Sequence, residues 1–145
     1  MAPWGRARKV ELLASMAIFS ACSRRELGQV AAVAVQGELP EGAVLTRQGQ
    51  KGGLAYVIGQ GTAEVVRDGR RLASLGPGDV VGELSLIDGA PRSATVQALT
   101  PLQVLEINSE DLRRLLRKAP GVRRKLLEAL SERLREADRL PTSRL

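Results

Sequence analysis

Residues 78–95 read GDVVGELSLIDGAPRSAT, and this stretch decides both the fold and the site. Its first half predicts one helical turn that is entered at Gly82, and its second half leads into a strand in which apolar and polar side chains alternate from Ser93 to Ala98. A helix N-terminus offers unpaired N–H groups and a partial positive charge, which suit an anion. Arg92 can reach back toward that turn and pair two phosphate oxygens through its planar guanidinium. The stretch therefore predicts a phosphate site inserted between strands.

Two further polar residues narrow the kind of ligand. Ser93 adds a hydroxyl donor beside Arg92. Glu83 follows Gly82 directly, and because a carboxylate would repel a phosphate, we expect Glu83 to point at hydroxyl donors instead. A ligand that carries both a phosphate and hydroxyl groups is a sugar phosphate or a nucleotide.

The sequence on both sides of this stretch predicts a β-rich region over residues 37–107. Turn-forming residues recur there at intervals of about 8 to 12 residues, which is typical of many short strands in a sandwich or barrel. Asp68-Gly69 separates two of these segments and predicts a two-residue hairpin, because glycine tolerates the positive φ of such turns.

Helical patterns precede the β-rich region. The apolar residues of Val10–Phe19 predict a buried helix or a pair of helical turns. Ser23 and Glu26 have the spacing of a capping box, so a second helix is predicted to begin near Ser23 and to run through Val33. These helices are expected within residues 8–36.

Two closing helices are predicted within residues 108–140. The first begins at the capping residue Asn108, and Pro120-Gly121 is expected to break the helical pattern before a final helix over Val122–Leu140. Four small or apolar residues of the final helix form a short heptad seam, namely Leu127, Leu130, Leu134 and Ala137. The whole chain, 1–145, is thus predicted as a single α+β domain that is mainly β.

The composition excludes several classes of site. The chain has no His and one cysteine, Cys22, so His-based catalysis, His-ligated metals, an intrachain disulfide and a cysteine-rich metal site are excluded. No apolar run reaches the roughly 18 residues of a membrane span, and the cysteine count fits a reducing, cytoplasmic setting. The net charge of +6 permits an anionic partner without naming it.

Residues 82–86 (GELSL) followed by residues 91–95 (PRSAT) resemble the phosphate-binding cassette of cyclic nucleotide-binding domains. This family includes the bacterial catabolite activator proteins and the regulatory subunits of protein kinase A. The resemblance covers nearly the whole chain, from the N-terminal helices to the closing helices. It implies an eight-stranded antiparallel β-roll of jelly-roll type over residues 37–107, flanked by the N-terminal and the two closing helices.

The resemblance also implies roles for individual residues. Glu83 would accept a hydrogen bond from the ribose 2′-hydroxyl, and Arg92 would pair the cyclic phosphate. The other implied contacts are backbone N–H groups and a hydroxyl, so that the expected ligand-binding residues are Gly82, Glu83, Leu84, Ser85, Arg92, Ser93 and Ala94. The ligand expected from the resemblance is cAMP, with cGMP second.

The final helix would lie over the base as a lid, with Leu134, Ala137 and Asp138 as the expected lid residues. Ala137 and Asp138 stand where catabolite activators place hydroxyl groups that read the base. The lid residues therefore leave the choice between cAMP and cGMP open.

Three functions remain open from the sequence. The leading one is a cytoplasmic sensor that binds cAMP or cGMP, forms a homodimer through Val122–Leu140 and signals to an unknown downstream protein by moving its closing helices. The second is the sensor fragment of a transcription regulator; only five residues follow Leu140, so DNA binding by this chain alone is not expected. The third is a degenerate domain without ligand that serves dimerisation or partner docking. No enzyme, catalytic residue, metal or cofactor is expected, because the cassette supplies neither a metal nor acid–base groups.

Overall fold

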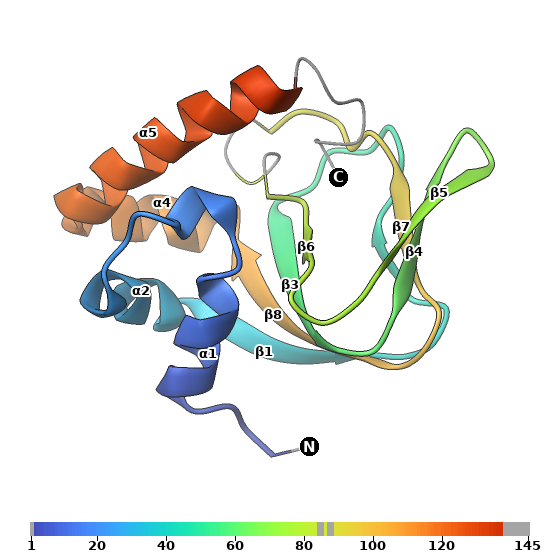
Figure 1. Cartoon of the computed structure of the whole chain (residues 1–145), viewed down its shortest axis with the longest axis horizontal. Coiled ribbons are helices and arrows are strands. Elements are labelled where there is room, and N and C mark those ends of the chain that lie inside the picture. The colour runs from blue at the N-terminus through green and yellow to red at the C-terminus, as the bar shows by residue number, and fades with distance from the viewer. Residues whose placement is uncertain (1, 84–85, 87–88, 138–145) are drawn as a thin grey trace.

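Two four-stranded antiparallel sheets and the helices that cover one of them make up the described part of the chain (Figure 1). The computed structural model describes residues 2–83, 86 and 89–137, and leaves out the side chains of residues 130 and 132–137. The elements are, in chain order, α1 (Arg6–Leu13), the short 3-10 helix η1 (Ala17–Phe19), α2 (Arg24–Ala31), β1 (Ala34–Leu39), β2 (Val44–Thr46), β3 (Leu54–Gln60), β4 (Ala63–Arg67), β5 (Arg70–Leu75), β6 (Val80–Val81), β7 (Thr95–Ala98), β8 (Leu102–Asn108), α4 (Ser109–Lys118) and α5 (Pro120–Ala137).

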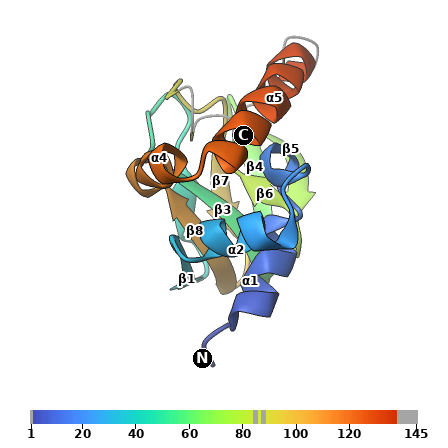
Figure 2. The ribbon, with the colours of Figure 1, turned by 90° about the vertical axis from the view of Figure 1, so that its left-hand side faces the viewer.

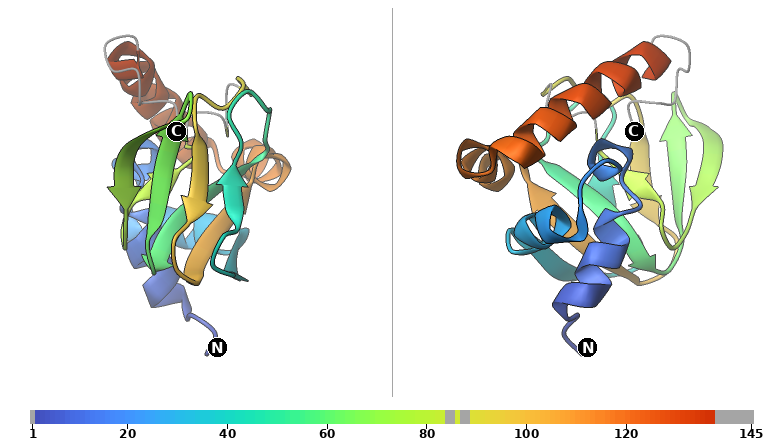
Figure 3. Two further views of the ribbon diagram at one scale, coloured as in Figure 1. Left: turned by 90° about the vertical axis from the view of Figure 1, so that its right-hand side faces the viewer. Right: turned by 60° about the vertical axis from the view of Figure 1, so that its left-hand side comes forward.

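The strands form a roll in which the two sheets face each other (Figure 3). The strand order is β1-β8-β3-β6 in one sheet and β2-β7-β4-β5 in the other. The interior of the roll is filled by apolar side chains from both sheets, among them Tyr56, Ile58, Val65, Val81, Val96, Leu102 and Val104. The eight strands confirm the predicted mainly β fold.

Strand β3 contributes to two cores at once. Because successive side chains of a strand point to opposite faces, Tyr56 and Ile58 enter the roll whereas Ala55 and Val57 pack under the helices. The helices lie together on that outer face, as Figure 2 shows. Their core includes the fully buried Phe19 and Leu13.

The predicted hairpin is present between β4 and β5. Asp68 has a φ of 52° and Gly69 a φ of 76°, so both central residues are left-handed, as a type I′ turn requires. No heavy atom lies within 4 Å of a Cβ built at Gly69, so this glycine is needed for its conformation and not for space.

The capping box is also confirmed, but the helix that it starts is shorter than predicted. Glu26 N–H donates to Ser23 Oγ at 3.2 Å, and Ser23 N–H donates to the Glu26 carboxylate at 2.8 Å. The helix ends at Ala31, and β1 already begins at Ala34, ahead of the predicted start of the roll at residue 37. The pairing of Ala34 with Ile107 of β8 extends the strand, and this long-range contact is not visible in local sequence patterns.

The second of the closing helices begins earlier than predicted. Helix α5 starts at Pro120, whereas the sequence pattern predicts a start at Val122. Proline is favoured in the first turn of a helix because its missing N–H would have no intrahelical partner there. The predicted end of this helix at Leu140 lies outside the described residues.

Helix α5 is fixed to the rest of the molecule by apolar and ionic contacts. Val122 and Leu126 are each 1% exposed and belong to the core under the helices, whereas Leu127 is 52% exposed. Lys125 Nζ pairs with Glu26 Oε1 at 2.5 Å. Glu26, which completes the capping box of α2, therefore also binds α5. This ion pair lowers the pKa of Glu26 to about 2, with help from the backbone hydrogen bond of Ser23.

Adjacent leucines on α5 test how the helix is packed. We expect Leu126→Ala to lower the free energy of unfolding by about 2–5 kcal/mol, because the change leaves a cavity in the core. Leu127→Ala is the matched control and should change it by no more than about 0.5 kcal/mol. Urea denaturation at low protein concentration measures both. Equal losses in the two variants would contradict this packing.

The pH dependence of stability tests the pair between Lys125 and Glu26. The folded pKa of Glu26 is about 2, below its ordinary value of 4.5, so its stabilising effect is complete above pH 4.5 and is lost as the pH falls toward 2. Glu26→Gln keeps a side chain able to complete the capping box but removes the charge. The melting temperature of Glu26→Gln should lie below that of the unmodified protein at pH 7, and the difference should shrink over this acidic range. A difference that does not change with pH would refute the role of the charge.

Candidate functional site

The cassette turn depends on a glycine at position 82. Gly82 has a φ of 81°, and its carbonyl accepts a hydrogen bond from Leu86 N–H at 3.1 Å. A Cβ at Gly82 would lie 2.3 Å from Arg92 Nη1 and 2.9 Å from the carbonyl oxygen of Leu54. The turn therefore needs glycine both for its conformation and for the space that Arg92 occupies. The predicted ligand residues Leu84 and Ser85 lie outside the described residues.

Arg92 is buried beside this turn, with only 4% of its surface exposed. Its Nη2 donates to the carbonyl of Leu54 at 2.5 Å. A Cβ at Gly52 would lie 2.8 Å from the same nitrogen, so the guanidinium fits between two glycines, Gly52 and Gly82. Its backbone N–H also donates to the carbonyl of Gln50 at 2.9 Å. Arg92 is thus held in one position by parts of the chain that are distant in sequence.

A polar cavity of about 200 Å³ opens next to Arg92. Its walls are strand β2, the loop that joins β2 to β3, and Tyr56 of β3. Arg47 and Lys51 of the loop line it together with Arg92, and among the residues that the structure describes no carboxylate lines it. Burial and the nearby Glu106 carboxylate raise the pKa of Tyr56, while the positive charge of Arg92 opposes the shift. The cavity is therefore suited to an anion.

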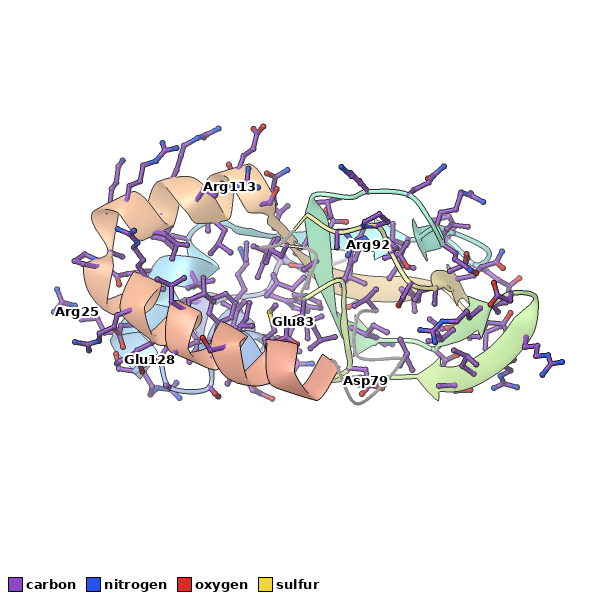
Figure 4. The ribbon with its side chains drawn as sticks, turned by 90° about the horizontal axis from the view of Figure 1, so that it is seen from above. Arg25, Asp79, Glu83, Arg92, Arg113 and Glu128 are labelled. Atoms are coloured by element: carbon purple, nitrogen blue, oxygen red, sulfur yellow. The ribbon has the colours of Figure 1, made fainter. Side chains whose placement is uncertain are left out.

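Within the protein, the Glu83 carboxylate binds a backbone N–H group of the N-terminal helices. It is 7% exposed, and its Oε1 accepts a hydrogen bond from the backbone N–H of Ile18 at 2.8 Å. Figure 4 shows Glu83 on the side of the closing helices and Arg92 beside the strands. The carboxylate therefore connects the cassette to η1, a contact between residues far apart in the sequence that no local pattern signals.

Ser93 and Ala94 follow Arg92 directly in the chain. Ser93 Oγ is buried, and among the described residues it has no hydrogen-bond partner, so it can still donate to a ligand. The Ser93 carbonyl accepts from Arg67 Nε at 2.9 Å, and the Ala94 carbonyl accepts from Thr46 Oγ1 at 3.1 Å. Thr46 of β2 and Arg67 of β4 thus hold this segment from the two strands that flank β7. No sequence motif indicates either residue.

The predicted lid is only partly described. Leu134 and Ala137 lie on the backbone of α5, but their side chains are outside the description, and Asp138 lies outside the described residues. In Figure 1 helix α5 runs from α4 toward the end of the roll that carries β6. The helix therefore extends toward the part of the molecule where the cassette lies.

The described residues were compared with the requirements of a metal site and of a membrane-spanning helix. Within residues 2–83, 86 and 89–137, no three His, Cys, Asp or Glu side chains form a group that could hold a metal ion. In the same part of the chain, no helix is both long enough and apolar enough to cross a membrane.

Known proteins resemble this chain in sequence and in structure. It is 38% identical over 104 residues to the cyclic AMP receptor protein of Thermus thermophilus, covering 68% of this chain and 48% of that protein. It is 30% identical over 125 residues to the cAMP-dependent protein kinase type II regulatory subunit of Drosophila melanogaster, covering 86% of this chain and 33% of that protein. The chain thus spans half or less of the length of these two relatives.

A solved structure and a family model agree with these matches. The N-terminal domain of a transcriptional regulator from Streptomyces coelicolor A3(2) superposes with a TM-score of 0.77 at 34% identity, covering 87% of this chain and 94% of that one. The family model described as "Cyclic nucleotide-binding domain" matches residues 36–119, which include β2 to β8 and the cassette. The chain belongs to the cyclic nucleotide-binding domain family.

Proposed function

We propose that this domain is a sensor that binds a cyclic nucleotide, with cAMP preferred to cGMP, and signals by repositioning its closing helices. The observation that carries the proposal is the buried guanidinium of Arg92, which is held between Gly82 and Gly52 at the edge of a polar cavity. The preference for cAMP is supported by the names of the relatives in Thermus and Drosophila.

The chemistry of capture is electrostatic. A cyclic phosphate carries one negative charge, which the Arg92 guanidinium can pair in a site that excludes most water. The Ser93 hydroxyl is buried without a partner among the described residues and adds a donor. These groups are already fixed by the surrounding backbone, so little ordering is needed when the ligand binds.

The signal would leave the site through Glu83. Its carboxylate accepts from Ile18 N–H of η1, and η1 packs against α5. A ribose hydroxyl that donates to Glu83 would compete with Ile18 or share the carboxylate with it, and so would change the position of η1 relative to the cassette. The ligand must bind one arrangement of α5 better than another for a signal to result.

The outer face of α5 is proposed as the contact of a homodimer. Leu127 belongs to the predicted heptad seam and is 52% exposed, whereas its neighbour Leu126 is buried in the domain itself. A second copy could bury this seam, and ligand-driven movement of α5 would then alter the dimer or its contact with a downstream protein.

Replacing Arg92 tests the binding proposal. We expect Arg92→Ala to weaken cAMP binding by about 2–5 kcal/mol, because a buried charge pair is lost. Arg92→Lys keeps the charge but cannot form the two-pronged contact, and should also weaken binding. Calorimetric titration with cAMP and cGMP measures this, with thermal melts to establish folding.

Arg113→Ala is the matched control, since Arg113 is exposed on α4 (Figure 4). It should bind cAMP as the unmodified protein does. Unchanged affinity in folded Arg92→Ala protein would refute the role of Arg92. No binding of either nucleotide by the unmodified protein would refute the proposed function.

The response of the helices tests the signalling proposal. On addition of cAMP, we expect backbone hydrogen exchange to change in η1 and α5, because the Glu83 contact ties both to the cassette. Exchange in the β4–β5 hairpin tip, which is far along the other sheet, serves as the internal control. Sedimentation of the same samples measures the oligomeric state. Identical exchange in η1 and α5 with and without bound cAMP would contradict this route.

A further inference from the structure

Strand β5 forms an outer edge of the roll. It is the last strand in the order β2-β7-β4-β5, so among the described residues only β4 pairs with it and its other edge is open. All residues from Arg70 to Ser74 are exposed, and Figure 1 shows the strand at the end of the molecule away from the helices. A second protein that binds its target as an extended chain can therefore reach this segment.

A β-bulge in this strand places Arg71 and Ser74 on the same face. Ala73 and Arg71 lie opposite successive residues of β4, so Leu72 between them is an extra residue in β5. In a regular strand, residues three apart point to opposite faces, and one extra residue reverses this relation. As a result, Arg71 Nη2 donates a hydrogen bond to Ser74 Oγ. The bulge thus brings a guanidinium to an exposed hydroxyl.

A carboxylate completes this group of side chains. Glu64 of β4 lies directly opposite Ser74, and Arg71 Nε lies 3.9 Å from Glu64 Oε2. An exposed ion pair of this length contributes little to stability, because water screens the two charges. Arg71 can therefore leave Glu64 for an anion that it binds more strongly.

The Ser74 hydroxyl has the surroundings of a phosphate acceptor. It accepts from Arg71 but donates to no acceptor among the described residues, so its proton is available to a base. Arg70 and Arg71 stand four and three residues before it, and the charges near an acceptor are among the features by which protein kinases select substrates. Of the exposed serines and threonines that the structure describes, Ser74 alone has an arginine three residues before it.

We propose that Ser74 is a phosphorylation site for an arginine-directed serine kinase, and that Arg71 binds the phosphate once it is attached. In this reaction Ser74 Oγ forms a bond to the γ-phosphorus of ATP, and the bond from that phosphorus to the oxygen bridging the β- and γ-phosphates breaks. ADP leaves with the electron pair of the broken bond, and the hydroxyl proton passes to a base of the kinase. The inference does not depend on cyclic nucleotide binding.

The modification changes the charge that β5 presents. A phosphoserine carries a charge of about −1.5 to −2 at pH 7, which Arg71 can pair through two phosphate oxygens. Glu64 repels the phosphate, so Arg71 moves from the carboxylate to the phosphate. Two arginines and one carboxylate give this group a positive sum before the reaction, and the added phosphate makes the sum negative.

The test incubates the whole folded chain with ATP and a purified serine kinase that selects arginine three residues before its acceptor. Mass spectrometry of peptides locates the phosphate. A synthetic peptide of residues 68–77 establishes whether the kinase accepts the sequence itself. The variants are Ser74→Ala and Arg71→Gln, and Arg117→Gln on α4 is the matched control. All three positions are exposed, so folding should be retained.

We expect phosphorylation of the folded chain at Ser74, none at this position in Ser74→Ala, a rate about tenfold lower in Arg71→Gln and an unchanged rate in Arg117→Gln. Phosphorus NMR of the modified chain should show a second phosphate pKa below its ordinary value of about 6, because Arg71 favours the doubly charged form. Arg71→Gln should raise that pKa toward its ordinary value.

Two outcomes would overturn the phosphorylation site. If the kinase modifies the peptide but modifies Ser74 of the whole chain only after unfolding in urea, the fold closes the site. If the kinase does not modify the peptide, the sequence around Ser74 is not a kinase site. Equal phosphate pKa values in the unmutated chain and in Arg71→Gln would refute the role of Arg71.

Discussion

The position of one buried guanidinium constrains most of this molecule. Arg92 fits between Gly82 and Gly52 and donates to the carbonyl of Leu54, so the cassette turn, the β2–β3 loop and the start of β3 must all meet at one point. A larger residue at either glycine would displace the arginine or the backbone. The roll therefore serves as a support that brings these segments together around one charge, and the cavity beside it follows from the same arrangement.

The second constraint runs from the cassette to the helices. Glu83 is adjacent to Gly82 in the chain, and its carboxylate accepts a hydrogen bond from the backbone N–H of Ile18 in η1. Glu26 has a comparable double role, because it completes the cap of α2 and also pairs with Lys125 of α5. Two carboxylates thus connect the cassette, the N-terminal helices and the closing helices in series.

Local patterns in the sequence predicted those features that depend on neighbouring residues. Asp68-Gly69 predicted its hairpin and Ser23 with Glu26 predicted the capping box, because each is a matter of backbone conformation or spacing within a few residues. The early start of β1 was missed because Ala34 is held in the strand by Ile107 of β8. The partner of Glu83 and the role of Thr46 were missed for the same reason, since each contact joins residues distant in sequence. The roles of the cassette residues came from the family resemblance, which no pattern of charge or hydropathy could replace.

Strand β3 gives the domain a particular kind of cooperativity. Alternate side chains of β3 belong to the core of the roll and to the core under the helices. Neither core can therefore lose its packing without disturbing a strand that the other core also uses. Partial unfolding that releases the helices and leaves the roll whole would expose Ala55 and Val57 to water. The two layers are therefore expected to melt as one unit, so that energy gained by a ligand in the roll protects the distant helices against unfolding as well.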